Sequence, residues 1–172
     1  MAINLFISGL LISSCIAIKE PKENPDTQHC ELSKFSLSNQ SSAAAALDWL
    51  ERENFDNSQC WIAGFSFGSL IAMQLLMRRP EINRFVVISP QPNVYDFSFL
   101  SPCPSSGIMI YGNKDELVPV ENINEINKRL SAQKGINVEF ISVSDANHFF
   151  SNSEKELKKV LNKYIKKESA LY

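Results

Sequence analysis

Four short apolar runs occur in the chain after residue 41, and each is bounded by polar residues, glycine or proline. Runs that are apolar throughout are typical of strands buried on both faces, because neither face alternates with polar residues. Such strands need a helix layer above and below them, so the runs favour a parallel sheet. The predicted strands cover Cys60–Ala63, Phe85–Ile88, Ile108–Tyr111 and Val138–Ile141.

Segments with helical periodicity separate these runs and follow the last of them. Apolar residues recur every three or four positions, as Ala43, Leu47 and Leu50 do, whereas the second segment is apolar almost all round and should be buried. Ser151 and Ser153 each have a glutamate three residues later, so both are capping-box candidates for the last helix. The alternation predicts an α/β fold, a three-layer αβα sandwich with a mostly parallel sheet. The predicted helices cover Ser41–Glu53, Leu70–Met77, Asn122–Gln133 and Ser153–Lys167.

The first 40 residues do not follow this pattern. Ala2–Ile18 is largely apolar but is shorter than the roughly 20 residues of a membrane span. Lys19–Gln40 is polar, contains prolines and has no periodicity, so it is predicted to be a linker. The predicted organisation is therefore a divergent segment over residues 1–40 and an α/β core over residues 41–172.

Ser13-Ser14-Cys15 leaves two localisations open. The tripeptide resembles a bacterial lipoprotein cleavage box, in which Cys15 would carry the lipid, and the apolar run has the length of a signal sequence. No lysine or arginine precedes that run, although a signal sequence begins with positive charge. We expect a cytoplasmic protein, with an exported lipoprotein anchored at Cys15 as the alternative.

Charge and cysteine content narrow the class of function. A net charge of −2 over 172 residues gives no electrostatic footprint for nucleic acid. The four cysteines are widely spaced without a C-x-x-C pair, and only two histidines are present, which argues against a disulfide framework and against a zinc site. One of those histidines, His29, lies in the polar linker. The lysines of the last helix are predicted to form a solvated face, with a basic docking patch as the alternative.

The pentapeptide Gly64-Phe65-Ser66-Phe67-Gly68 is a G-x-S-x-G motif in the context that the motif requires. It follows a predicted strand and precedes a predicted helix, so Ser66 would lie on a tight turn with its hydroxyl exposed above the sheet edge. The glycines relieve the crowding of that turn. Ser66 is therefore a candidate nucleophile, and the backbone N–H of Phe67 is a candidate oxyanion donor. A glycine-rich packing turn is the alternative.

An acid and a base are predicted at the same edge of the sheet. Asp115 follows the third predicted strand and His148 follows the fourth, and the carboxyl ends of parallel strands meet at one edge. A neutral imidazole can accept the proton of a serine, and a carboxylate on the other ring nitrogen fixes the tautomer. Asp115 is favoured because Gly112 and Asn113 would form a turn that presents it. Its rivals as the carboxylate are Asp96, which follows the second predicted strand, and Glu116 and Asp145.

These motifs together resemble the α/β-hydrolase superfamily, and specifically the small lidless bacterial hydrolases related to dienelactone hydrolase. The resemblance implies that Ser66 is the nucleophile, Asp115 the acid, His148 the base and Phe67 one oxyanion donor. It also implies that no metal and no organic cofactor takes part. The stretches that carry it are Ala43–Leu50, Trp61–Gly68, Tyr95–Leu100, Pro102–Gly107, Gly112–Pro119 and Asn147–Phe150.

The chain departs from this family before the alanine-rich helix, where the family has its first strands and a second oxyanion donor. Either Ile3–Ile18 pairs beside the strand at Cys60–Ala63, or the chain is a truncated remnant with a bare sheet edge that would favour a homo-oligomer. We predict a serine hydrolase of a small ester, thioester or lactone, with Phe65 as a weaker candidate for substrate contact. The alternative is a catalytically impaired, hydrolase-like scaffold.

Overall fold

The computed structural model describes residues 40–48 and 60–170. Four strands form one sheet in the order β1-β2-β3-β4, and every neighbouring pair is parallel. The connections carry helices, so the α/β class and the parallel sheet predicted from the sequence are confirmed. The strands are β1 (Cys60–Phe65), β2 (Ile82–Ile88), β3 (Ser106–Gly112) and β4 (Val138–Val143).

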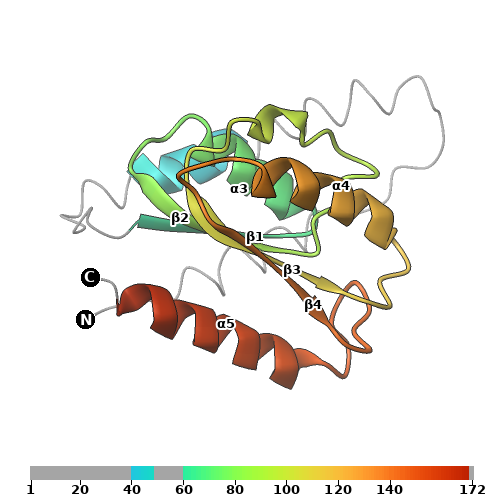
Figure 1. Ribbon diagram of the computed structural model, residues 1–172. Coiled ribbons are helices and arrows are strands. Elements are labelled where there is room, and N and C mark those ends of the chain that lie inside the picture. The colour runs from blue at the N-terminus through green and yellow to red at the C-terminus, as the bar shows by residue number, and fades with distance from the viewer. Residues whose placement is uncertain (1–39, 49–59, 171–172) are drawn as a thin grey trace.

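Helices cover both faces of this sheet, as Figure 1 shows. Of the helices that the structure describes, α5 (Glu154–Ser169) lies on one face, while α3 (Phe67–Leu76) and α4 (Val120–Ser131) lie on the other. A short 3-10 helix, η2 (Ser98–Leu100), lies in the connection between β2 and β3, and residues 40–48 are helical. The three-layer sandwich follows from this placement.

The alternation of side chains along β2 explains why two separate cores form. Phe85 and Val87 point into a core shared with α3 and α4, whereas Val86 and Ile88 point into a core shared with Tyr164 of α5. Burial of both faces requires the strand to be apolar throughout, which is the pattern that identified it. As expected, α3 is buried almost all round, and nine of its ten residues are buried.

Two local expectations differ from the structure. Ser153 does occupy the N-cap position of α5, but its side chain makes no capping hydrogen bond, and its φ of −123° and ψ of 14° are not the extended values usual for a capping serine. Ser151 lies outside the helix, and its backbone N–H donates instead to Asn147 Oδ1 at 2.9 Å. The capping-box prediction was therefore wrong for both serines.

The register of the sheet aligns the strand ends that carry the candidate residues. Phe65 is paired with Ile88, so β1 and β2 end at one level, whereas β3 continues past Ile110 to Gly112, which is paired with Val143 at the end of β4. The ladder continues one residue further, because the N–H of Ser66 donates to the Ile88 carbonyl at 2.9 Å and that of Ser89 to the Ile110 carbonyl at 2.8 Å. The loops that follow the strands therefore start from fixed positions.

Candidate active site

Ser66 lies on a sharp turn between β1 and α3. Its φ of 52° and ψ of −119° are a strained combination for a residue with a side chain, and such strain is concentrated at functional sites. Gly64 makes the turn possible, because a Cβ added there would lie 2.2 Å from the carbonyl oxygen of Gly68. The side chain of Ser66 makes no capping bond to α3, which leaves its hydroxyl available to other partners.

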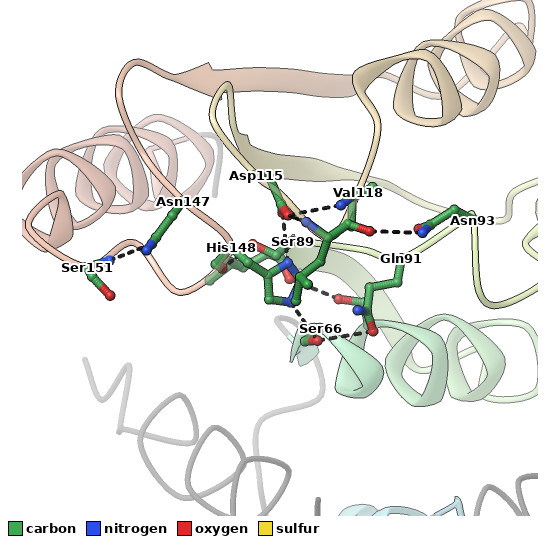
Figure 2. A network of polar contacts seen from close by, with 12 residues as sticks. Ser66, Ser89, Gln91, Asn93, Asp115, Val118, Asn147, His148 and Ser151 are labelled. Carbon is green, nitrogen blue, oxygen red and sulfur yellow. Dashed lines mark hydrogen bonds and ion pairs between the residues drawn. The ribbon is translucent and has the colours of Figure 1, made fainter. Parts of the chain in front are cut away.

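Three side chains meet at this edge of the sheet, as Figure 2 shows. Ser66 Oγ lies 2.9 Å from His148 Nε2, and His148 Nδ1 lies 2.8 Å from Asp115 Oδ2. The side chain of His148 is fully buried, and only 2% of the Asp115 side chain is exposed. Because an ionised carboxylate can only accept, Nδ1 carries the proton in this pair and Nε2 faces Ser66 with its lone pair.

Asp115 is held by its own loop. Its second oxygen, Oδ1, accepts hydrogen bonds from the backbone N–H groups of Leu117 at 2.9 Å and Val118 at 3.0 Å. Those two bonds fix the rotation of the carboxylate, so that Oδ2 is directed at His148. The carboxylate is therefore positioned before any substrate arrives.

The loop of His148 is joined to the loop of Asp115. The N–H of Lys114 donates to the carbonyl of Ala146 at 3.0 Å, and Asn113 Oδ1 accepts from the N–H of Asp145 at 2.7 Å. Gly112 allows this approach, because a Cβ there would lie 2.1 Å from the Ala146 carbonyl oxygen. The loop of His148 is also joined to the end of β2, because Ser89 Oγ donates a hydrogen bond to the carbonyl of His148 at 2.8 Å.

The rival carboxylates lie elsewhere. Asp96 is exposed, and the hydrogen bonds that it accepts from the backbone N–H and the hydroxyl of Ser98 lower the pKa of its carboxyl group. Asp145 forms an exposed ion pair with Lys114 at 2.6 Å. Glu116 is exposed to solvent. The structure thus brings Asp115, and neither Asp96 nor Asp145, into contact with the imidazole.

Aromatic rings enclose the imidazole. The ring of Phe65 lies 5.7 Å from that of His148, and the ring of Phe149 lies 5.1 Å from it at an edge-on angle of 84°. Phe67 is the first residue of α3, and its ring packs against Tyr95 with centroids 5.4 Å apart. The helix dipole is positive at this end of α3, which favours a negative charge near the backbone of Phe67.

The sequence analysis did not identify Gln91, yet it contacts the candidate nucleophile. Ser66 Oγ lies 3.2 Å from Gln91 Oε1, in addition to its contact with His148. The available signal was a polar residue between two prolines just beyond the second strand. That signal does not predict where the side-chain amide of Gln91 points, because the course of the loop determines its orientation.

Several expectations concern parts of the chain outside the described residues, including Ile3–Ile18, Cys15 and His29. Among residues 40–48 and 60–170, no group of three histidine, cysteine, aspartate or glutamate side chains could hold a metal ion. The described helices include none that is both long enough and apolar enough to span a membrane. Cys60 and Cys103 are buried, and burial raises the pKa of the Cys103 thiol.

The sequence matches the dienelactone hydrolase family over residues 16–171. The chain belongs to the dienelactone hydrolase family. This assignment agrees with the resemblance drawn from the sequence motifs, and it fits the α/β-hydrolase fold of solved structures that resemble the chain. Membership identifies the family and its fold.

Three relatives show how far the similarity of this dienelactone hydrolase family member extends. An uncharacterised protein of Rickettsia prowazekii (strain Madrid E) is 45% identical over 127 residues, which are 72% of this chain and 53% of that protein. A structure of a protein of unknown function from Agrobacterium tumefaciens, described as an α/β hydrolase, is 47% identical with a TM-score of 0.74, covering 76% of this chain and 60% of that one. A lidless serine hydrolase from Xanthomonas campestris shares the fold at 24% identity and a TM-score of 0.64, covering 74% and 56%. The chain therefore spans little more than half the length of these relatives.

Proposed function

We propose that this protein is a serine hydrolase that cleaves a small ester, thioester or lactone through an acyl-enzyme. The observation that carries the proposal is the 2.9 Å contact between Ser66 Oγ and His148 Nε2, with the buried Asp115 on the other ring nitrogen. A serine hydroxyl becomes nucleophilic when a neighbouring base accepts its proton. Family membership supports the same class of reaction.

In the proposed reaction, Ser66 Oγ attacks the carbonyl carbon of the substrate while its proton passes to His148 Nε2. The buried carboxylate of Asp115 stabilises the imidazolium that forms. The backbone N–H of Phe67 is the proposed donor to the oxyanion, with the dipole of α3 adding to it. The imidazolium then protonates the leaving group. In deacylation, His148 accepts a proton from a water molecule that attacks the acyl carbon, and it returns that proton to Ser66 Oγ as the acid is released.

The surroundings of the nucleophile favour an uncharged substrate. Large apolar side chains are exposed on the loops that follow β2, β3 and β4, namely Val94 at 56%, Leu117 at 44% and Phe149 at 60%. Of the charged residues on these loops, Lys114 and Asp145 pair with each other, and Asp96 and Glu116 are exposed to solvent. An apolar rim of this kind stabilises a short acyl or aryl group more than it stabilises an anion.

Turnover of p-nitrophenyl butyrate tests the proposal. The protein should hydrolyse the ester, and Ser66→Ala should remove the activity down to the rate of the buffer. Ser131→Ala serves as the matched control, because Ser131 is an exposed serine on α4. A Ser66→Ala variant that retains the wild-type rate would refute the proposal.

A non-catalytic, hydrolase-like scaffold is the second proposal. It is favoured by one observation: among the strands that the structure describes, β1 has a neighbour on one side only. The same assay separates the two proposals, since a scaffold that folds should give no turnover above the buffer rate with short-chain esters.

A further inference from the structure

Ser66 Oγ has two polar neighbours, and they compete for one proton. His148 Nε2 lies 2.9 Å from Oγ on one side, and Gln91 Oε1 lies 3.2 Å from it on the other. Figure 2 shows the amide of Gln91 directed at Ser66 from the loop after β2. A serine hydroxyl has one proton to donate and two lone pairs that accept. Both neighbours cannot receive the same proton.

The position of Gln91 is fixed by its backbone. Its carbonyl accepts hydrogen bonds from the N–H groups of Val94 at 3.1 Å and Tyr95 at 2.9 Å, which close a turn. Prolines on both sides restrict the backbone further. Asn93 Nδ2 donates to the Leu117 carbonyl at 2.9 Å, which joins this turn to the loop of Asp115. The amide is therefore held beside the nucleophile by the same framework that holds the carboxylate.

The charge of the imidazole decides which way the amide should face. When His148 is neutral, Nδ1–H donates to Asp115, and the hydroxyl of Ser66 must donate to Nε2. Oγ then offers only lone pairs to Gln91, so its favourable partner is the Nε2–H of the amide. When His148 is protonated, its Nε2–H donates to Oγ, and the hydroxyl is free to donate to Gln91 Oε1. Figure 2 draws the amide with Oε1 toward Oγ, and a 180° rotation of the amide brings its NH₂ group to the same position.

We propose that Gln91 is a catalytic residue of the hydrolase reaction, whose amide rotates to donate a hydrogen bond to Ser66 Oγ during attack. The inference rests on the proposed function. As the Oγ–carbon bond forms and the proton moves to His148, the amide N–H stabilises the negative charge that develops on Oγ. It does so again when Oγ leaves during deacylation. A side-chain amide suits this role because it can donate or accept within one position.

The charges that face His148 determine what a substitution at position 91 would do. Asp115 faces the ring from the loop after β3, and the other neighbours that the structure describes are Ser66 and the rings of Phe65 and Phe149. Lys114 and Asp145 lie on the adjacent loops and pair with each other. A carboxylate at position 91 would therefore be a second negative charge beside the imidazole, and it could only accept the proton of Ser66.

The experiment compares kcat/KM for p-nitrophenyl butyrate across pH in wild type, Gln91→Glu and Gln91→Met. Gln91→Met keeps the size of the side chain and removes both hydrogen-bonding groups, so kcat/KM should fall about tenfold with no shift of the pH profile. The kcat/KM of Gln91→Glu should fall further than that of Gln91→Met near neutral pH. Its acidic limb should move up by about one pH unit, because a nearby carboxylate favours the protonated imidazole.

Two outcomes would overturn the inference. If Gln91→Glu and Gln91→Met both retain the wild-type profile within twofold, the amide has no role at Oγ. If both lose activity equally with unshifted profiles, the side chain of Gln91 supports the loop and does not act on Oγ. Thermal unfolding of each variant shows that the fold is retained. Failure of the proposed function looks different, since wild type itself would then be inactive.

Discussion

Asp115→Asn replaces one carboxylate oxygen with an NH₂ group, and the surrounding hydrogen bonds fix the orientation of the new side chain. In the wild type, Oδ1 accepts from the N–H groups of Leu117 at 2.9 Å and Val118 at 3.0 Å. An asparagine must keep its oxygen toward those two donors, because its own NH₂ group cannot accept. The NH₂ group is then directed at His148 Nδ1, where Oδ2 lies in the wild type at 2.8 Å.

That arrangement imposes the wrong tautomer on the imidazole. Nδ1 must become an acceptor for the NH₂ group, so Nε2 carries the ring proton and points it at Ser66 Oγ. The ring can no longer accept the proton of the serine. Loss of the correct tautomer in a Ser-His-Asp arrangement lowers kcat by about 10⁴-fold, which corresponds to about 5 kcal/mol of transition-state stabilisation. Because the two backbone hydrogen bonds survive, the variant should still fold.

Steady-state hydrolysis of p-nitrophenyl butyrate measures this loss, with thermal unfolding as the check on folding. Asp96→Asn is the matched control, because Asp96 follows the preceding strand and lies exposed on its loop. It should keep wild-type kcat. An Asp115→Asn variant that folds and retains kcat within tenfold of the wild type would refute the tautomer argument.

Three further predictions concern the loops and the packing of α5. Gly112→Ala should lower the unfolding temperature more than Gly135→Ala and also reduce kcat, because its Cβ would lie 2.1 Å from the Ala146 carbonyl oxygen. Gly135→Ala meets no atom within 4 Å and adds only the backbone strain of its φ of 87°, so equal unfolding temperatures for the two variants would contradict this. Glu168→Gln should destabilise the fold by about 2 kcal/mol in urea titrations, because Arg84 Nε lies 3.0 Å from Glu168 Oε2 and both side chains are largely buried; an unchanged urea midpoint would count against it. Burial of Tyr164, with the charge of Glu168 adding to it, raises the pKa of its phenol, so the folded state keeps the proton where the unfolded state loses it. The contribution of this phenol to the free energy of unfolding should therefore be fully present below about pH 10 and decline above it. In urea titrations, Tyr164→Phe should lose less stability than wild type between about pH 9 and 11, and equal losses would refute the assignment.

The centres of the strands could be read from the sequence, and their ends could not. Phe85–Ile88 is apolar throughout, but β2 begins at Ile82 and includes the polar Arg84. A charged residue argues against a buried strand unless it has a partner. Here the partner is Glu168, which is 84 residues away in the sequence and lies on α5. No local pattern reveals that pair.

The same contrast applies to the candidate site. Ser66 is identified by a local motif, because the tight turn imposes its glycines on the sequence. Asp115 and His148 follow from the rule that the ends of parallel strands share one edge. Gln91 could not be predicted, since its contact with Ser66 depends on the turn closed by Val94 and Tyr95. The Asp96 alternative likewise required coordinates, because both aspartates follow strand ends.

The central claim is that Ser66 is a nucleophile activated by His148, and covalent labelling tests it most directly. The folded protein is treated with a fluorophosphonate, and the modified residue is located by mass spectrometry of its peptides. We predict one phosphonyl adduct on Ser66, formed in wild type and absent from His148→Ala, which retains the serine. A folded wild-type protein that takes up no label, or that carries the label on another residue, would contradict the account.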